Sequence, residues 1–421
     1  MSAPRPPADP PPGRTSHPEW RGAALGVLAA VFAFNMLGRG SGETYAVFLQ
    51  PLEREFGWSR SQLTGVYGLY LLVGGFLAPF VGTLFDRVGP RAVYGAGIAS
   101  IAAAYLLAST LSSLWQFYLY VGVLVGVGVA LVGMVPASGL LTRWYHARLS
   151  AAIGIAFSAV GCGVLVFVPL TQLVIAHLDW RSTYRALGIM MLVLLPLAML
   201  GLPWRTFAAG HPEVHRRARE RRAGDGWTLL TAMRTWAYWG LAAMFFFTSL
   251  GMFAVMPQTV VYLIDAGFEP VAAATAFGVT SMLSVATLAG IGFVAARFGY
   301  RRTITVSFVG SSIGLLVLFA LSRYPVGGLL VVYVLVFGAC QGARGPIISA
   351  ICTTKFAGPR VATIYGTTYA ANSLGGAAGS VIGGALHDLT GGYGAVFAFA
   401  IASLAVAATP IWAVRELREF R

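Results

Sequence analysis

The chain has few charged residues and almost no lysine. Only 10% of its 421 residues are charged, whereas soluble domains carry roughly 25%, and Lys355 is the only lysine. The three cysteines, Cys162, Cys340 and Cys352, have no metal-ligand spacing and do not indicate a disulfide framework. The sequence also offers no nucleophile–base pairing and no phosphate-binding loop. It therefore predicts no enzyme, no cofactor and no metal site.

Apolar sequence dominates the chain. The residues AVILMFWYC make up 57% of it, and the mean hydropathy is +0.73. This composition predicts an all-α membrane protein, because only helices and closed barrels satisfy their backbones in lipid. Twelve apolar segments of spanning length lie near residues 22–50, 61–83, 91–110, 114–142, 148–176, 183–203, 236–264, 270–296, 302–322, 327–352, 360–386 and 393–414.

A polar, arginine-rich stretch divides the predicted spans into six and six. We expect a disordered tail at 1–19, a six-helix half at 20–204, a linker at 205–234, a second six-helix half at 235–415 and a tail at 416–421. With both termini and the linker cytoplasmic, 22 of the 29 basic residues lie inside. The net charge of +14 then reflects topology in the cell membrane and predicts no nucleic-acid partner.

The two halves repeat a loop motif 210 positions apart. The first copy, between spans 2 and 3, has the pattern G-x-x-x-D-R-x-G-x-R, and the second, between spans 8 and 9, keeps its glycines and arginines. Pro136 and Pro346 have the same separation. Such repeats are typical of secondary transporters, whose sites lie between two halves near the midplane.

The motif, its echo and the six-plus-six layout resemble the major facilitator superfamily over roughly residues 20–415. The resemblance implies twelve transmembrane helices in that fold and alternating access. It also implies that the loop residues gate the cytoplasmic side by locking the helix ends in the outward-open state. The residues carried over are Gly82, Asp86, Arg87, Gly89 and Arg91 and, in the second half, Arg297, Gly299 and Arg301.

A narrower resemblance begins at Thr44. The passage TYAVFLQPLEREFGWSR at 44–60 is similar to bacterial members of the monocarboxylate and oxalate/formate transporter groups. This resemblance implies transport of a small organic carboxylate, often together with a proton.

Three charged residues lie within predicted spans: Arg39, Glu43 and Arg344. Each costs roughly 2.5–3.5 kcal/mol to insert, so such residues mark a pathway, a binding site or a buried ion pair that fixes helix packing. Arg39 and Glu43 can pair with each other, whereas Arg344 lacks an obvious partner. In the family's fold both arginines would face a central cavity, and we expect the substrate-binding set to be completed by Asn35, Tyr67, Tyr70, Gln258, Tyr365, Tyr369 and Asn372.

The sequence favours a monomeric secondary transporter of a small organic anion, with Glu43 carrying a proton. Two arginines against one glutamate leave a site of charge +1, which suits an anion. One alternative is a proton-driven efflux pump for amphipathic drugs, in which the tyrosines form an apolar pocket. Another is a membrane sensor that no longer transports.

Overall fold

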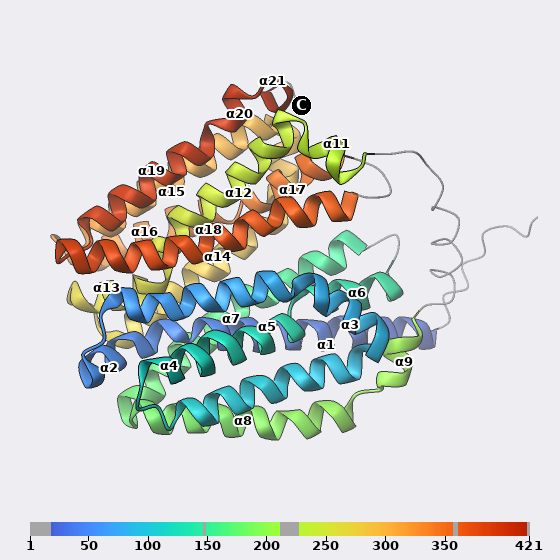
Figure 1. Cartoon of the computed structure of the whole chain (residues 1–421), viewed down its shortest axis with the longest axis horizontal. Helices are drawn as coiled ribbons and strands as arrows, with labels where there is room; N and C mark the ends of the chain where they lie inside the picture. Colours follow the sequence, from blue (N-terminus) through green and yellow to red (C-terminus); the bar gives the residue numbers. More distant parts are fainter. Residues whose placement is uncertain (1–17, 146–148, 211–226, 357–360, 419–421) are drawn as a thin grey trace, which may run out of the picture.

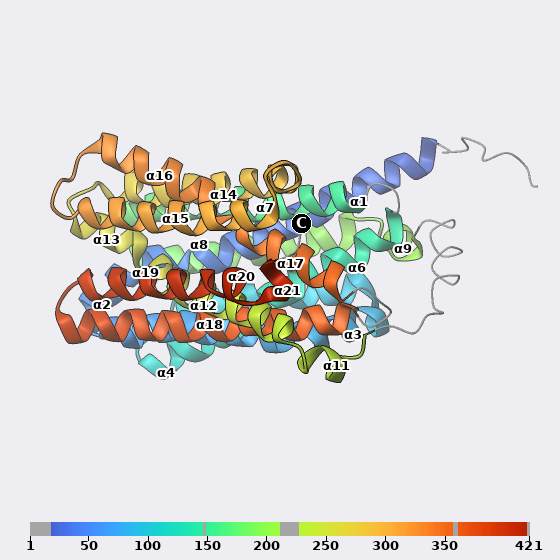
Figure 2. The same cartoon turned by 90° about the horizontal axis from the view of Figure 1, so that it is seen from above.

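The computed structural model describes residues 18–145, 149–210, 227–356 and 361–418, and every regular element in these ranges is helical. Most helices run along the long axis of the molecule (Figures 1 and 2). The N-terminal half contains α1 (Pro18–Glu43), α2 (Tyr45–Phe56), α3 (Arg60–Ala108), α4 (Leu114–Phe117), the π-helix η1 (Tyr118–Val125), α5 (Gly126–Val132), α6 (Met134–Trp144), α7 (Leu149–His177), α8 (Trp180–Gly201) and α9 (Trp204–Ala209).

The C-terminal half lies above the N-terminal half in Figure 1. It contains α11 (Leu229–Met233), α12 (Trp236–Val255), the 3₁₀-helix η2 (Met256–Gln258), α13 (Thr259–Asp265), α14 (Pro270–Phe298), α15 (Tyr300–Ala320), α16 (Gly327–Gln341), α17 (Arg344–Lys355), α18 (Val361–Thr390), α19 (Gly394–Ala408), α20 (Pro410–Ala413) and α21 (Arg415–Arg418). The predicted domain boundaries remain predictions, and the tail at 1–17 and much of the linker lie outside the described residues.

Ten segments of the described chain are long and apolar enough to cross a membrane. One of them, α3, has 49 residues, which is about 73 Å at 1.5 Å per residue and enough for two crossings. The 30-residue α18 is not among the ten, but it packs lengthwise against α12 and α3. If α3 is counted twice and α18 is added, the described residues contain twelve helical rods.

The motif between the second and third predicted spans is a bend in α3 rather than a separate loop. Helical structure continues on both sides of Gly89, whose φ of 82° is the only non-helical backbone inside α3. Glycine adopts this left-handed region without steric cost, and the following Pro90 has no backbone N–H to donate across the bend. Gly299, with a φ of 86°, forms the corresponding bend between α14 and α15.

Two helix pairs make the most extensive contacts between the halves, α3 with α18 and α7 with α14. Both contacts depend on glycine. A Cβ added to Gly68 would lie 3.0 Å from the Ala377 carbonyl oxygen, and one added to Gly161 would lie 2.9 Å from the Met282 Cα. Small residues let membrane helices approach this closely.

The halves are tied together at one end of the molecule. At this closed end, defined by the start of α3 at Arg60, the Arg60 guanidinium pairs with Glu53 at 2.7 Å and with Asp265 of the other half at 3.4 Å. Asp388, also from the other half, accepts hydrogen bonds from the backbone N–H groups of Arg60 and Ser61 at 3.0 and 2.8 Å.

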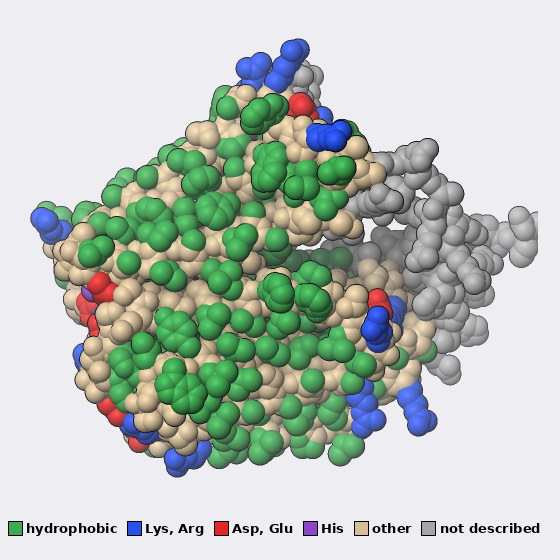
Figure 3. Space-filling model, viewed as in Figure 1, with side chains coloured by type: hydrophobic (Ala, Val, Ile, Leu, Met, Phe, Trp, Pro, Cys, Tyr) green, Lys and Arg blue, Asp and Glu red, His purple; other side chains and the backbone are tan. Residues whose placement is uncertain are grey.

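At the opposite end the halves separate. Figure 3 shows a gap between them at this open end, which is formed by α6 and the adjoining part of α3 below and by α17 and α18 above. The start of α1, α9 and α11 also lie at this end (Figure 2). The conformation is therefore closed at one end and open at the other.

Candidate functional site

Arg39 and Glu43 form an ion pair at the end of α1. Their spacing of four residues places both side chains on one helix face, and Arg39 Nη2 lies 2.8 Å from Glu43 Oε1. The Tyr67 hydroxyl of α3 donates to the Glu43 carboxylate and lies 2.9 Å from each oxygen. The Glu43 side chain is 6% exposed, while that of Arg39 is 31% exposed. Arg39 is thus the member of the pair that water and solutes can reach.

The first span tightens at the residue that follows this pair. At Thr44 the backbone N–H shares the carbonyls of Gly40 and Ser41 at 3.2 and 3.3 Å, so α1 ends in a tightened turn and α2 begins at Tyr45. The Tyr105 hydroxyl donates to the Ser41 carbonyl at 2.6 Å and secures the turn from α3.

Tyrosines from both halves surround the Arg39–Glu43 pair. Tyr67, Tyr70 and Tyr369 all lie within electrostatic range of Arg39. Tyr70 is buried, and its hydroxyl has no hydrogen-bond partner in the described part of the chain. Tyr369 comes from α18 of the opposite half and is 45% exposed. Tyr369 is thus a predicted C-terminal site residue that interacts electrostatically with Arg39.

Arg344 lies inside the C-terminal half. The residue is 1% exposed, its Nη2 donates to Ser311 Oγ at 3.1 Å and to Met252 Sδ at 3.4 Å, and its guanidinium carbon sits 5.2 Å from the centre of the Phe308 ring. Its Nε and Nη1 have no partner among the described residues. These contacts all come from α12 and α15. That Arg39 and Arg344 bind the same substrate at one site stays a prediction.

The remaining predicted polar residues bond mainly within their own helices or half. Asn35 donates to the Val31 carbonyl at 2.9 Å, and Gln258 donates to the Ala254 carbonyl at 3.1 Å, each four residues back along the chain. Asn372 accepts a hydrogen bond from Ser249 of α12. The Tyr365 hydroxyl lies 3.0 Å from Ser349 Oγ of α17. The side-chain amides of Asn35 and Gln258 thus each donate to the backbone. The side-chain amide oxygen of Gln258 is buried and has no partner among the described residues.

The predicted gating residues lie at the open end. Arg143 of α6, which sequence reasoning missed, pairs with Asp86 at 3.1 Å, and its guanidinium lies over the Phe85 ring. Arg87 and Arg91 are exposed, and Gly82 lies near Val135. In the second half Arg301 stacks over Trp412 at 4.4 Å, and Arg297 lies 5.9 Å from the Phe298 ring centre. Their gating role stays a prediction.

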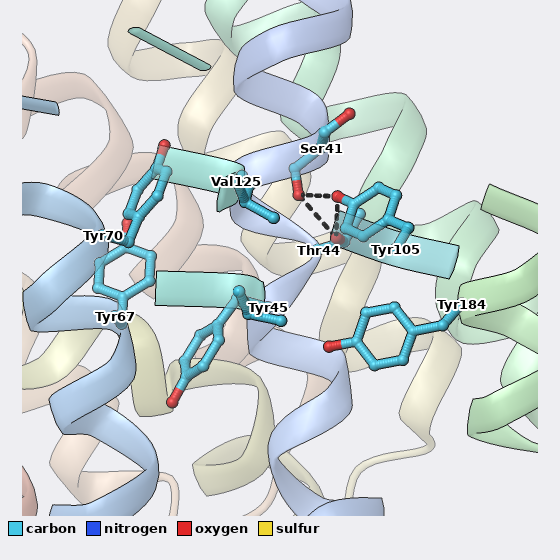
Figure 4. Close-up of a pocket in the computed structure, with 10 residues that line it drawn as sticks. Ser41, Thr44, Tyr45, Tyr67, Tyr70, Tyr105, Val125 and Tyr184 are labelled. Carbon is cyan, nitrogen blue, oxygen red and sulfur yellow. Dashed lines mark hydrogen bonds between the residues drawn. The ribbon is translucent and has the colours of Figure 1, made fainter. Parts of the chain in front are cut away.

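A small cavity lies behind the ion pair, within the N-terminal half (Figure 4). Tyr45, Tyr67, Tyr105 and Tyr184 line it, and Figure 4 shows the Tyr184 hydroxyl pointing inward. This hydroxyl has no partner among the described residues. The cavity is of water size and too small for an organic anion.

Comparisons with known proteins agree with this architecture. A family model described as Major Facilitator Superfamily matches residues 23–295 and 284–419. Monocarboxylate transporter 13 of Bos taurus is 25% identical over 379 residues, covering 90% of this chain and 86% of the bovine protein. Monocarboxylate transporter 11 of Homo sapiens is 27% identical, covering 88% and 78%. An uncharacterized MFS-type transporter of Bacillus subtilis is 28% identical over 177 residues, covering 42% and 43%.

Proposed function

This chain belongs to the major facilitator superfamily, and we propose that it moves a small organic monocarboxylate across the cell membrane by proton-coupled alternating access. The family match and its relatives make it a multi-pass membrane transporter of the monocarboxylate group rather than an enzyme. Relatives named monocarboxylate transporters support a small organic anion as the substrate.

The unpaired guanidinium of Arg344 is the observation that carries this proposal. An arginine cannot lose its proton in a protein, and an unpaired buried charge costs several kcal/mol. Two of the three guanidinium nitrogens of Arg344 have no partner on the described residues. A carboxylate can accept two parallel hydrogen bonds from such a fork. Arg344 is covered in this conformation, so the proposal requires that another state of the cycle exposes it to the gap.

The charge of the site favours an anion with one carboxylate. Arg39 and Glu43 neutralise each other at 2.8 Å, and Arg344 adds one uncompensated positive charge. While Glu43 is ionised, a monocarboxylate brings the sum to zero, whereas a cationic drug raises it. This balance argues against the efflux of cationic compounds.

Proton coupling is assigned to Glu43. When its carboxylate is ionised, Arg39 is held by the ion pair. When Glu43 takes up a proton, the ionic attraction is lost and the partly exposed Arg39 can turn to a substrate carboxylate. A proton and an anion would then occupy the site together, and this linkage produces symport.

Alternating access would come from rocking of the half at 20–204 against the half at 235–415. In this orientation the closed end faces outward and the open end inward, with both termini and the linker of the monomer in the cytoplasm. The conformation described here would then be inward-open. An anion held between the halves would draw them together and drive the switch.

The test is the thermal stability of the purified protein with a panel of carboxylates, for the parent and Arg344→Lys. Lysine keeps the charge but lacks the planar fork, so binding of the stabilising acid should weaken about tenfold or more. Arg323→Lys, at an exposed loop between α15 and α16, is the matched control and should behave as the parent.

Equal stabilisation of the parent and Arg344→Lys by the same acid would remove Arg344 as a carboxylate ligand. Stabilisation by cationic amphipathic drugs, with no response to any carboxylate, would replace the proposal with the efflux alternative.

A further inference from the structure

The small cavity of Figure 4 lies where the α1–α2 turn, α3, α8 and η1 meet. Thr44 borders it from the turn, Tyr105 from α3 and Tyr184 from α8, while Val121 and Val125 of the π-helix η1 form an apolar part of the wall. A π-helix is rare and is often found at functional sites. The cavity has room for about one water molecule.

The position of the Tyr184 hydroxyl is fixed by packing. Its ring stacks on Phe48 with the ring centres 3.7 Å apart and meets Trp180 edge-on at 6.2 Å. The hydroxyl lies on the long axis of the ring, so rotation of the ring about this axis does not move it. Figure 4 shows it pointing into the cavity, and it has no hydrogen-bond partner among the described residues. A buried hydroxyl without a partner is unfavourable, because it has lost its hydrogen bonds to water.

Tyr105 and Thr44 contribute hydrogen-bond acceptors to the same cavity. The Tyr105 hydroxyl donates to the Ser41 carbonyl at 2.6 Å, and the Thr44 hydroxyl donates to the same carbonyl at 2.7 Å. A hydroxyl has one proton and two lone pairs, so both hydroxyls have used their donor and can still accept. Their oxygens lie 3.2 Å apart, and both residues are buried. One buried donor and two buried acceptors therefore border a space of water size.

We propose that this cavity binds one ordered water molecule, held by Tyr184, Tyr105 and Thr44. The water accepts a hydrogen bond from the Tyr184 hydroxyl and donates one each to the oxygens of Tyr105 and Thr44. Buried waters typically make about three such bonds to polar groups that otherwise lack partners. The water connects α8 and α3 to the turn that follows Glu43. It is an internal part of the N-terminal half and is separate from the substrate site of the proposed function.

The proposal determines the sign of a stability change at Tyr184. Tyr184→Phe removes the hydroxyl and keeps the ring that stacks on Phe48. If the hydroxyl binds a water, its loss removes hydrogen bonds and should lower the unfolding temperature of the purified protein by about 1–3 °C. If the hydroxyl has no partner, its loss removes an unfavourable buried group and should leave the unfolding temperature unchanged or raise it.

Tyr94→Phe is the matched control. The Tyr94 hydroxyl is also buried and has no partner among the described residues, but Tyr94 does not line this cavity. We therefore expect Tyr94→Phe to leave the unfolding temperature unchanged or to raise it. Equal losses of stability in Tyr94→Phe and Tyr184→Phe would overturn the assignment to this cavity.

A density map of the parent protein that resolves ordered water tests the site directly. We expect a peak within hydrogen-bond distance of the Tyr184 hydroxyl and of the oxygens of Tyr105 and Thr44. The absence of this peak, in a map where the three side chains and other internal waters are well defined, overturns the proposal. An unfolding temperature that Tyr184→Phe leaves unchanged or raises does so as well.

The map decides the question even where Tyr184→Phe does not fold. Carboxylate binding is measured separately, so failure of the water site leaves the proposed function standing, and the absence of carboxylate binding leaves the water site standing.

Discussion

Glu43 lies between the guanidinium of Arg39 and the phenol of Tyr67, and the strength of both contacts depends on the charge of its carboxylate. Arg39 is 2.8 Å from one carboxylate oxygen, and Tyr67 donates to both oxygens at 2.9 Å. Loss of the carboxylate charge would weaken both contacts, because hydrogen bonds to an ionised acceptor are roughly twice as strong as neutral ones. Protonation would thereby free the arginine that water already reaches.

Glu43→Gln tests the coupling role at this residue. Glutamine keeps the length and can still accept from Tyr67, but it does not titrate. We expect accumulation driven by a pH gradient to be lost, while exchange of substrate across the membrane continues. Both are measured as fluxes in proteoliposomes. Undiminished gradient-driven accumulation would move the coupling to another group, such as His387–Asp388.

Residue spacing predicted the ion pair but not most side-chain directions. Arg39 and Glu43 are four apart, which is sufficient for pairing on a helix. The Asn35 side chain bonds the Val31 carbonyl of its own helix instead of facing a neighbour, and sequence periodicity carries no information on that choice. Arg143 was missed because its partner Asp86 is distant in sequence.

The elements at the open end hold the predicted inner gate. Asp86 is on the surface, with a side chain 77% exposed, so its pair with Arg143 contributes no more than about 1 kcal/mol to folding. We expect Asp86→Asn to fold and insert normally. Turnover should fall more than substrate affinity, because the residue biases conformations without touching substrate. Normal turnover in a well-expressed variant would remove the gating role.

The closed end depends on Asp388 of α18, which accepts from two backbone N–H groups at the start of α3. Asp388→Asn removes the charge from these bonds and should weaken closure by about 1–2 kcal/mol. We expect Thr64→Cys, buried near this contact, to be labelled several-fold faster in the Asp388→Asn background, with the native cysteines replaced.

Asp179→Asn is the control for this experiment. Asp179 also caps a helix, α8, by accepting from the Ser182 N–H, and that contact lowers the pKa of its carboxyl. Both residues of this cap belong to the N-terminal half, so its loss should not change labelling. Equal labelling rates with and without Asp388→Asn would exclude Asp388 from closure.

At the scale of elements, hydropathy located the spans but not their ends. The predicted loop at the first motif is a bend within α3, because a single left-handed glycine redirects the chain without unwinding its neighbours. The tightened turn at Thr44 was also unforeseen, since the tertiary contact from Tyr105 to Ser41 stabilises it.

For the whole molecule, the distribution of basic residues predicts the orientation in the membrane, and the arrangement of the helices is compatible with either orientation. Single cysteines placed in the linker at 205–234 should resist an impermeant thiol reagent added to intact cells and react after permeabilisation. A cysteine at Ser322, in the loop between α15 and α16, should show the opposite pattern. Labelling of the linker from outside would show that the orientation is the opposite one, with the open end facing the exterior.

The two-half architecture could be read from the repeat and the charge pattern, because both are periodic along the chain. The conformation could not. Under the proposed alternating access the same sequence adopts states open at either end, so closure at Arg60 and separation at α6 and α17 would depend on contacts whose free energies nearly balance between states.

Uptake of labelled carboxylates into proteoliposomes, with and without an inward proton gradient, tests the central claim most directly. Protein-free liposomes correct for weak acids that cross lipid unaided. We predict protein-dependent uptake of at least one monocarboxylate, raised above equilibrium by the gradient and reduced in Arg344→Lys. The account is contradicted if the functionally reconstituted protein moves no carboxylate, or if the gradient instead drives transport of cationic compounds.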